Sequence, residues 1–158
     1  MQEILDRAGV SRSTFYTHFR DTNDLFLSDV DDFFEAMATA LSRAGSKSKR
    51  IAPVAELFAH VGESRAFYSA LVESGRVQDV MELGQAQFAR GIEQRLIETG
   101  AAHTLPTRER GAIAEAFAGA LFSLLMWWIH HDRTPSAEEM DKLFHRLVSN
   151  GLGKSVAR

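Results

Sequence analysis

Apolar residues recur at three- and four-residue intervals along the chain, and no segment alternates between apolar and polar residues as a strand would. The intervals predict helices over about residues 1–8, 11–19, 21–44, 53–62, 64–74, 77–99, 107–131 and from 137 towards the C-terminus. Since every segment has the helical period, the sequence predicts an all-α fold.

Residues at the ends of these segments support the same division. Ser11 and Asp21 are good N-caps, Thr107 is a third, and Ser136 with Glu139 forms the pattern of a capping box. Glycines at 9, 75 and 100 are predicted to end helices. Residues 45–50, Gly-Ser-Lys-Ser-Lys-Arg, are small, polar and basic, which is typical of a linker.

Composition limits the classes that remain. The chain has 158 residues, is 45% apolar and contains no Cys, so it can bury a core without disulfides. Without Cys it cannot be a disulfide scaffold or use a cysteine nucleophile. The first apolar cluster is interrupted by Glu3, Asp6 and Arg7, which is unlike a signal peptide. We expect a cytoplasmic protein that does not associate with membranes.

Charge is distributed unevenly. The net charge is -3, yet residues 1–20 carry three Arg against two acids, and residues 21–35 carry six acids and no base. An anionic partner is therefore expected to meet the first twenty residues.

Residues 4–19 have the pattern of a helix-turn-helix. Two short amphipathic helices flank Gly9, which permits a tight turn, and Val10, Phe15 and Phe19 are predicted to wedge the helices together. The remaining surface of the second helix is polar and suited to the DNA major groove. Its predicted DNA-binding residues are Arg12, Ser13, Thr14, Tyr16, Thr17 and His18.

This segment resembles the DNA-binding segment of TetR-type bacterial transcriptional regulators. The resemblance rests on Ala8-Gly-Val-Ser, on Thr14-Phe-Tyr-x-His-Phe19, on an acidic helix start and on Leu25. It implies that Tyr16 and His18 contact phosphate, while Arg12, Ser13 and Thr17 lie where bases are read. It further implies a C-terminal ligand-binding domain whose last two helices form a four-helix bundle with a second subunit.

Two departures from the family pattern qualify the resemblance. Thr22 stands where the family usually has a phosphate-contacting lysine, and the chain begins after the family's first helix. We therefore predict a partial DNA-binding module over 1–26 and an effector-binding and dimerisation domain over 27–158. The expected function is a homodimeric repressor released from operator DNA by an effector. The alternative is a dimeric helical ligand-binding or interaction protein that does not bind DNA.

The predicted effector is small and apolar or aromatic, because aromatic and Met side chains dominate the candidate lining. Tyr68, Gln85 and His60 are the polar groups that would orient it. Any apolar residue of the candidate lining would serve equally as ordinary core. The candidate pocket residues are Phe33, Met37, Phe58, Phe67, Tyr68, Met81, Phe88, Phe122, Met126 and Trp127.

The segment from Ala116 to Ile129 contains no charged residue. Fourteen residues are too few to span a bilayer, which needs about 20, so this helix is expected to bury two faces. One face would pack on the core and the other on a second subunit, unless a monomer buries the helix centrally. The predicted interface comprises Ala116, Ala120, Ser123, Leu124, Trp128, Leu143, Phe144 and Leu147.

No pattern of catalytic residues stands out. Gly62-Glu-Ser64 lacks the second glycine of a nucleophile elbow, and no phosphate loop is present. His130, His131 and Asp132 could form a metal cluster with His145, but histidines also favour a helix C-terminus. We predict no catalytic site, metal or cofactor.

Overall fold

The computed structural model describes residues 2–45, 47–101, 105–131 and 135–153. In these residues the regular structure is entirely helical, which confirms the predicted all-α fold. The helices are α1 (Gln2–Ala8), α2 (Arg12–His18), α3 (Thr22–Ala38), α4 (Ala40–Arg43), α5 (Val54–Glu63), α6 (Arg65–Glu73), α7 (Val77–Glu98), α8 (Thr107–His130) and α9 (Ala137–Gly153).

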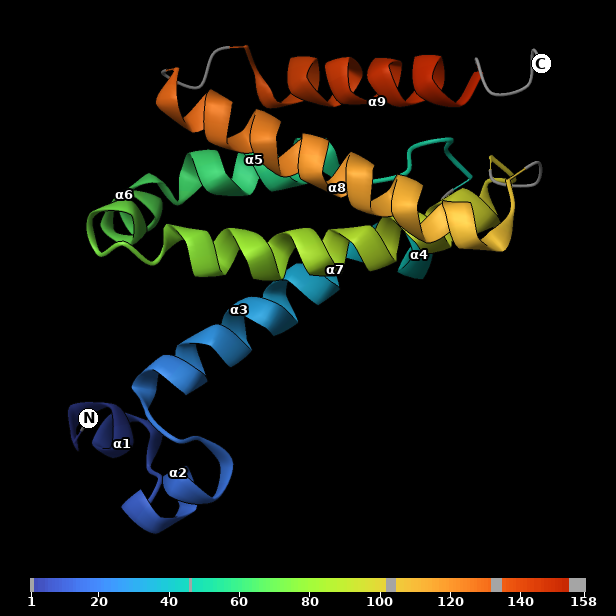
Figure 1. Ribbon diagram of the computed structural model, residues 1–158. Helices are drawn as coiled ribbons and strands as arrows, with labels where there is room; N and C mark the ends of the chain where they lie inside the picture. The colour runs from blue at the N-terminus through green and yellow to red at the C-terminus, as the bar shows by residue number, and fades with distance from the viewer. Residues whose placement is uncertain (1, 46, 102–104, 132–134, 154–158) are drawn as a thin grey trace.

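The arrangement has two parts joined by α3 (Figure 1). Helices α1 and α2 lie at the N-terminal end of α3, apart from the remaining helices. The C-terminal half of α3 enters a helical body, where α7 packs on both α3 and α8, and α5 packs on α9. Helix α3 is therefore the connection between the first twenty residues and the body.

Local side-chain caps set several helix starts. The Ser11 hydroxyl accepts a hydrogen bond from the Thr14 amide at 3.1 Å. Oδ1 of Asp21 accepts from the Asn23 amide at 2.8 Å and so satisfies a donor that the first turn of α3 leaves unpaired. The predicted caps at Ser11 and Asp21 are confirmed.

The last two helices begin differently. Ser136 donates its amide to Glu139 Oε2 at 2.8 Å, and the Glu139 amide donates to the Ser136 hydroxyl at 3.3 Å, which confirms the predicted capping box. The predicted cap at Thr107 is wrong. Pro106 is the N-cap of α8, and Thr107 is already in the helix without capping it by its side chain.

The single helix predicted over 21–44 is interrupted at Thr39. Its hydroxyl donates to the Glu35 carbonyl at 2.8 Å, a local bond that competes with the helical ladder. Helix α7 crosses α3 at this point, since a Cβ placed on Gly91 would lie 2.7 Å from the Ala38 carbonyl oxygen. The backbones of α3 and α7 are thus in direct contact where α3 ends.

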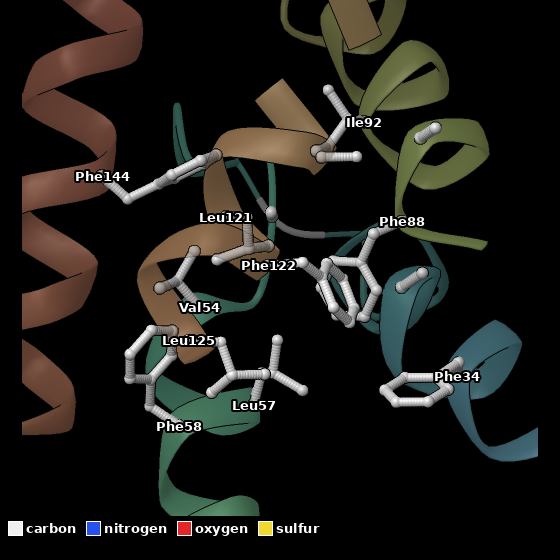
Figure 2. Close-up of a cluster of buried hydrophobic side chains, with 14 of the residues drawn as sticks. Phe34, Val54, Leu57, Phe58, Phe88, Ile92, Leu121, Phe122, Leu125 and Phe144 are labelled. Atoms are coloured by element: carbon white, nitrogen blue, oxygen red, sulfur yellow. The ribbon is translucent and has the colours of Figure 1, made fainter. Parts of the chain in front are cut away.

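The core is formed by side chains from α3, α5, α7, α8 and α9 (Figure 2). Phe34, Phe88 and Phe122 form an edge-to-face cluster, with ring centroids 5.5 to 6.3 Å apart. Gly84 of α7 makes room for it, because a Cβ there would lie 2.5 Å from the Phe122 ring. This cluster fixes the C-terminal half of α3 to α7 and α8.

The end of the predicted linker is anchored to the body. Arg95 of α7 is buried and donates to the Ser48 carbonyl at 2.8 Å and to the Arg50 carbonyl at 3.2 Å. Arg50 in turn donates to Glu56 at 3.0 Å and to Asp141 at 2.7 Å. These bonds join α7 and α9 to the segment that precedes α5.

Candidate DNA-binding surface and ligand cavity

Helices α1 and α2 form a compact pair around two aromatic side chains. Phe15 is buried, and its ring lies 5.6 Å from that of Phe19. Gly9 adopts a φ of 64°, the left-handed conformation that the turn requires. Val10 was predicted to wedge between the helices, but it is 38% exposed and contributes little to this packing.

All six predicted DNA-binding residues lie on the exposed surface of α2. The hydroxyls of Ser13 and Thr14 lie 2.9 and 2.8 Å from that of Ser11, and the Thr17 hydroxyl donates to the Ser13 carbonyl at 3.0 Å. Tyr16 is 53% exposed, so its hydroxyl is accessible. The six residues are Arg12, Ser13, Thr14, Tyr16, Thr17 and His18.

The connection from α2 to α3 is held by Arg20. Its amide donates to Asp24 Oδ2 at 3.0 Å, and its guanidinium pairs with Oδ1 at 3.2 Å. The backbone hydrogen bond, followed by the side-chain one, lowers the pKa of the Asp24 carboxyl below its usual range. Asp24 therefore accepts these bonds in its charged form and orients α2 relative to α3.

A cavity of about 380 Å³ lies between α3, the junction of α5 and α6, and the start of α7. This volume is within the ~300–1,000 Å³ typical of small-molecule sites. Its wall is mostly aromatic. The lining residues are Phe26, Asp29, Val30, Phe33, Phe34, His60, Ser64, Phe67, Tyr68 and Val80.

Three residues of the predicted pocket, Phe33, Phe67 and Tyr68, line this cavity. Phe58, Phe88 and Phe122 instead lie in the buried core with Met81. Met37 and Met126 are half-buried beside that core, and Trp127 is 45% exposed on α8. None of these seven lines the cavity.

Of the predicted orienting groups, His60 and Tyr68 line the cavity and Gln85 does not. Phe26 and Asp29 were missed. Their spacing with Val30 and Phe33 places all four on one face of α3, and this periodicity was the signal available in the sequence.

The polar groups of the cavity are few. Tyr68 is 3% exposed, and its hydroxyl has no hydrogen-bond partner in the described part of the chain. Burial raises the pKa of Tyr68 to about 12, so the hydroxyl keeps its proton at neutral pH. His60 packs against Phe33, with ring centroids 4.4 Å apart. Tyr68 can therefore donate a hydrogen bond to a bound molecule.

The predicted dimer-interface residues divide into three groups by exposure. Ala116, Ala120 and Ser123 are exposed on α8, and Leu147 of α9 is 50% exposed. Leu124 and Leu143 are half-buried. Trp128 and Phe144 are 4% and 1% exposed. Trp128 and Phe144 pack in the core of the chain itself. The prediction placed them on an exposed interface, so for these two residues it is wrong.

Helix α8 is long and apolar enough to cross a membrane by length and composition alone, a test that core helices of soluble proteins also pass. Here Ala118, Leu121 and Leu125 are fully buried, and the helix packs along α7. One face of α8 thus lies in the core, while 33% of its most apolar 18-residue window is buried.

No group of metal-ligating side chains is found in the described residues. His145, one member of the possible cluster, accepts a hydrogen bond from the Ile51 amide at 3.2 Å. Its ring is thereby part of the packing before α5. Asp132, another member, lies outside the described residues.

A short helix, a glycine turn and a second helix with a polar exposed face define the class of helix-turn-helix DNA-binding proteins. Two family models match the chain. "Bacterial regulatory proteins, tetR family" covers residues 1–28, and "Transcriptional regulator C-terminal region" of the same family covers residues 53–150. The chain belongs to the TetR family of bacterial transcriptional regulators, which confirms the resemblance drawn from residues 8–25.

A curated relative supports the assignment. The chain is 24% identical over 156 residues to the "Uncharacterized HTH-type transcriptional regulator YxbF" of Bacillus subtilis (strain 168). The match covers 94% of this chain and 39% of the relative, so the chain spans about two fifths of that protein's length. No solved structure matches significantly.

Proposed function

We propose that the chain is a repressor that binds operator DNA as a homodimer and is released when a small apolar ligand fills the cavity beside α3. The observation that carries this proposal is the double role of α3. It is joined to the exposed helix α2 at its N-terminal end, and it supplies five of the ten cavity-lining residues.

The exposed face of α2 suits the DNA major groove. Tyr16 and His18 would contact phosphates, which position the protein without reading sequence. Arg12, Ser13 and Thr17 would reach base edges, since guanidinium and hydroxyl groups are suited to the donors and acceptors there. Thr14 would help to hold the start of α2, because its amide and hydroxyl both lie within hydrogen-bond distance of the Ser11 hydroxyl.

The coupling between the cavity and DNA binding would follow from the contacts that hold α3. Its C-terminal half is packed against α7 through Phe34 and Ala38. Its N-terminal half meets α6 at the cavity, where the rings of Phe26 and Phe67 lie 6.2 Å apart. A ligand inserted there would push α3 away from α6 and so tilt α2. Two recognition helices must lie ~34–36 Å apart to read adjacent half-sites, so a small tilt is enough to weaken DNA binding.

A second subunit would cover the outer face of α8. Ala116, Ala120, Ser123 and Trp127 follow one another at three- and four-residue intervals, and all four are exposed. Small residues permit close helix approach, and Leu147 extends the face onto α9. A two-fold pairing through α8 and α9 gives a four-helix interface.

The test is a mobility-shift assay with DNA from beside the gene, using this chain and any in-frame N-terminally extended form. We expect a specific shift from a dimer, reversed by a ligand that occupies the cavity. A ligand that binds without reversing the shift would refute the release mechanism. A dimer that binds the ligand and shifts no DNA in either form would favour the alternative, a ligand-binding protein without DNA-binding activity.

A further inference from the structure

The described lining of the cavity carries one formal charge, on Asp29, whose side chain is exposed at the edge of the cavity. Among its ten lining residues Asp29 is the only Asp, Glu, Lys or Arg. Asp29 has no ion-pair partner in the described part of the chain. It lies on α3 one turn from Phe26 and one turn from Phe33. An unpaired carboxylate at the edge of an apolar cavity attracts cations and repels anions.

The rest of the wall is also suited to a cation. Phe26, Phe33, Phe67 and Tyr68 line the same space, and the Phe67 and Tyr68 rings meet edge to face at 5.3 Å. The faces of aromatic rings carry negative potential, so they attract organic cations, and quaternary ammonium groups in particular are held in aromatic cages. Apolar surface on the same ligand would gain by burial against these rings.

Ligands of other charge fit the wall less well. A carboxylate or phosphate would meet Asp29 with no Lys or Arg among the described lining residues to offset the repulsion. A neutral apolar molecule would gain from burial but nothing from Asp29, whose exposed carboxylate would stay solvated by water. The Tyr68 hydroxyl adds one donor for an acceptor atom of the ligand.

We propose that the ligand of this cavity is an organic cation with an apolar, aromatic body, whose ammonium group lies beside Asp29 and whose body lies between Phe33 and Phe67. This proposal rests on the proposed function, in which the cavity controls DNA binding. It narrows the effector from the small apolar ligand of that function to one whose apolar body carries a positive charge.

Two isosteric probes separate charge from shape in the full 158-residue chain. Benzyltrimethylammonium is the cation, and neopentylbenzene replaces its nitrogen by carbon. Benzylsulfonate serves as the anion. In NMR titrations we expect the cation to bind at least fivefold more tightly than the hydrocarbon, with no binding of the anion. Asp29→Asn removes the charge at constant shape and should weaken cation binding about fivefold without changing hydrocarbon binding.

The matched control is Asp32→Asn, which removes an exposed charge from α3 outside the cavity and should leave cation binding unchanged. Phe67→Leu should weaken binding of both the cation and the hydrocarbon. Equal binding of the two probes, or an Asp29→Asn variant that binds the cation as tightly as the native chain, would overturn the cation proposal. So would failure of the cation to bind at millimolar concentration.

A mobility-shift assay in the presence of each probe separates this proposal from the proposed function. If the hydrocarbon binds as tightly as the cation and releases DNA, ligand control stands and the cation proposal is wrong. If the cation binds with the expected dependence on Asp29 but DNA remains bound, the ligand class is correct and the release mechanism is wrong.

Discussion

The guanidinium of Arg76, just before α7, donates a 2.6 Å hydrogen bond to Oδ1 of Asn23 in the first turn of α3. Together with the contact between Phe26 and Phe67, it ties the N-terminal half of α3 to the body. Both interactions lie nearer the N-terminus of α3 than the core cluster around Phe34. They are therefore the contacts that a tilt of α3 would break first.

Arg76→Ala should loosen this end of α3 alone. One exposed hydrogen bond is worth roughly 0.5–1.5 kcal/mol, so amides of residues 24–30 should exchange about three to ten times faster. Hydrogen exchange measured by mass spectrometry or NMR tests this, with Arg90→Ala on the exposed face of α7 as control. Unchanged exchange in residues 24–30 would mean that the bond does not hold the helix.

Gly84→Ala should destabilise the protein. The added Cβ would lie 2.5 Å from the Phe122 ring and 2.9 Å from that of Phe34, and both rings are buried. We expect a loss of about 1–3 kcal/mol in the free energy of unfolding, measured in urea. Gly111→Ala of α8 is the control, because its Cβ would meet nothing closer than 3.9 Å. That change should stabilise the helix by about 0.5–1 kcal/mol, and similar effects at both glycines would contradict the packing described.

The ion pair of Arg50 should make stability depend on acid pH. The hydrogen bond from Arg50 lowers the pKa of the Glu56 carboxyl below its ordinary value of 4.5. A lowered folded pKa stabilises the protein above the unfolded pKa, and this stabilisation is lost as the pH falls through the folded pKa. Arg50→Gln should cost about 1–2 kcal/mol at pH 7, since Asp141 also loses the hydrogen bond from Arg50.

At pH 3 the cost of Arg50→Gln should be clearly smaller. Urea unfolding at both pH values measures it. Arg43→Gln, which breaks a pair with Glu35 that is exposed on both sides, should cost less than about 0.5 kcal/mol. An equal cost of Arg50→Gln at pH 7 and pH 3 would rule out the ionic contribution.

Tyr16→Phe keeps the ring that packs edge-on against Phe15 and removes only the hydroxyl. As a phosphate contact, that hydroxyl should contribute to binding of every DNA sequence, and its loss should weaken all of them by about tenfold. Substitution of Arg12 should instead alter sequence preference. Binding to a panel of operator variants distinguishes these patterns, and a Tyr16→Phe effect confined to one base position would count against the phosphate assignment.

Ala120→Arg should disrupt the proposed dimer. Ala120 is exposed in the middle of the α8 face, and a long charged side chain there would prevent close helix approach. Light scattering at micromolar concentration should change from a dimeric to a monomeric mass. Ala36→Arg, on the exposed face of α3, should stay dimeric. A native chain that is already monomeric would refute the interface.

The local features of the fold were predictable because they depend on neighbouring residues. The caps at Ser11 and Asp21 need only a hydroxyl or carboxylate within three residues of a free amide. The wall of the cavity was not predictable in the same way. Phe67 and Phe88 are both aromatic residues of amphipathic helices, yet Phe67 lines the cavity and Phe88 packs with Phe34 and Phe122. The packing of α3 against both α6 and α7 decides between them.

Trp127 and Trp128 illustrate the same limit on α8. Adjacent helix positions point about 100° apart, and a helix that is apolar all round has no polar face to fix its rotation. The structure turns Trp128 inward, where its indole donates to the Pro135 carbonyl at 2.6 Å, and leaves Trp127 outside, stacked on His131. The periodicity predicted that two faces of this helix are buried. It could not show which face packs on the core of the chain and which faces outward.

The backbone contact between Gly91 and Ala38 makes the end of α3 a fulcrum. Phe33 lies five residues from Ala38, and Thr22 lies sixteen. At a rise of roughly 1.5 Å per residue, these are lever arms of about 8 and 24 Å. If a ligand rotates α3 about Ala38 as proposed, Thr22 moves roughly three times as far as Phe33, so an ångström of displacement in the cavity becomes about three ångströms beside α2.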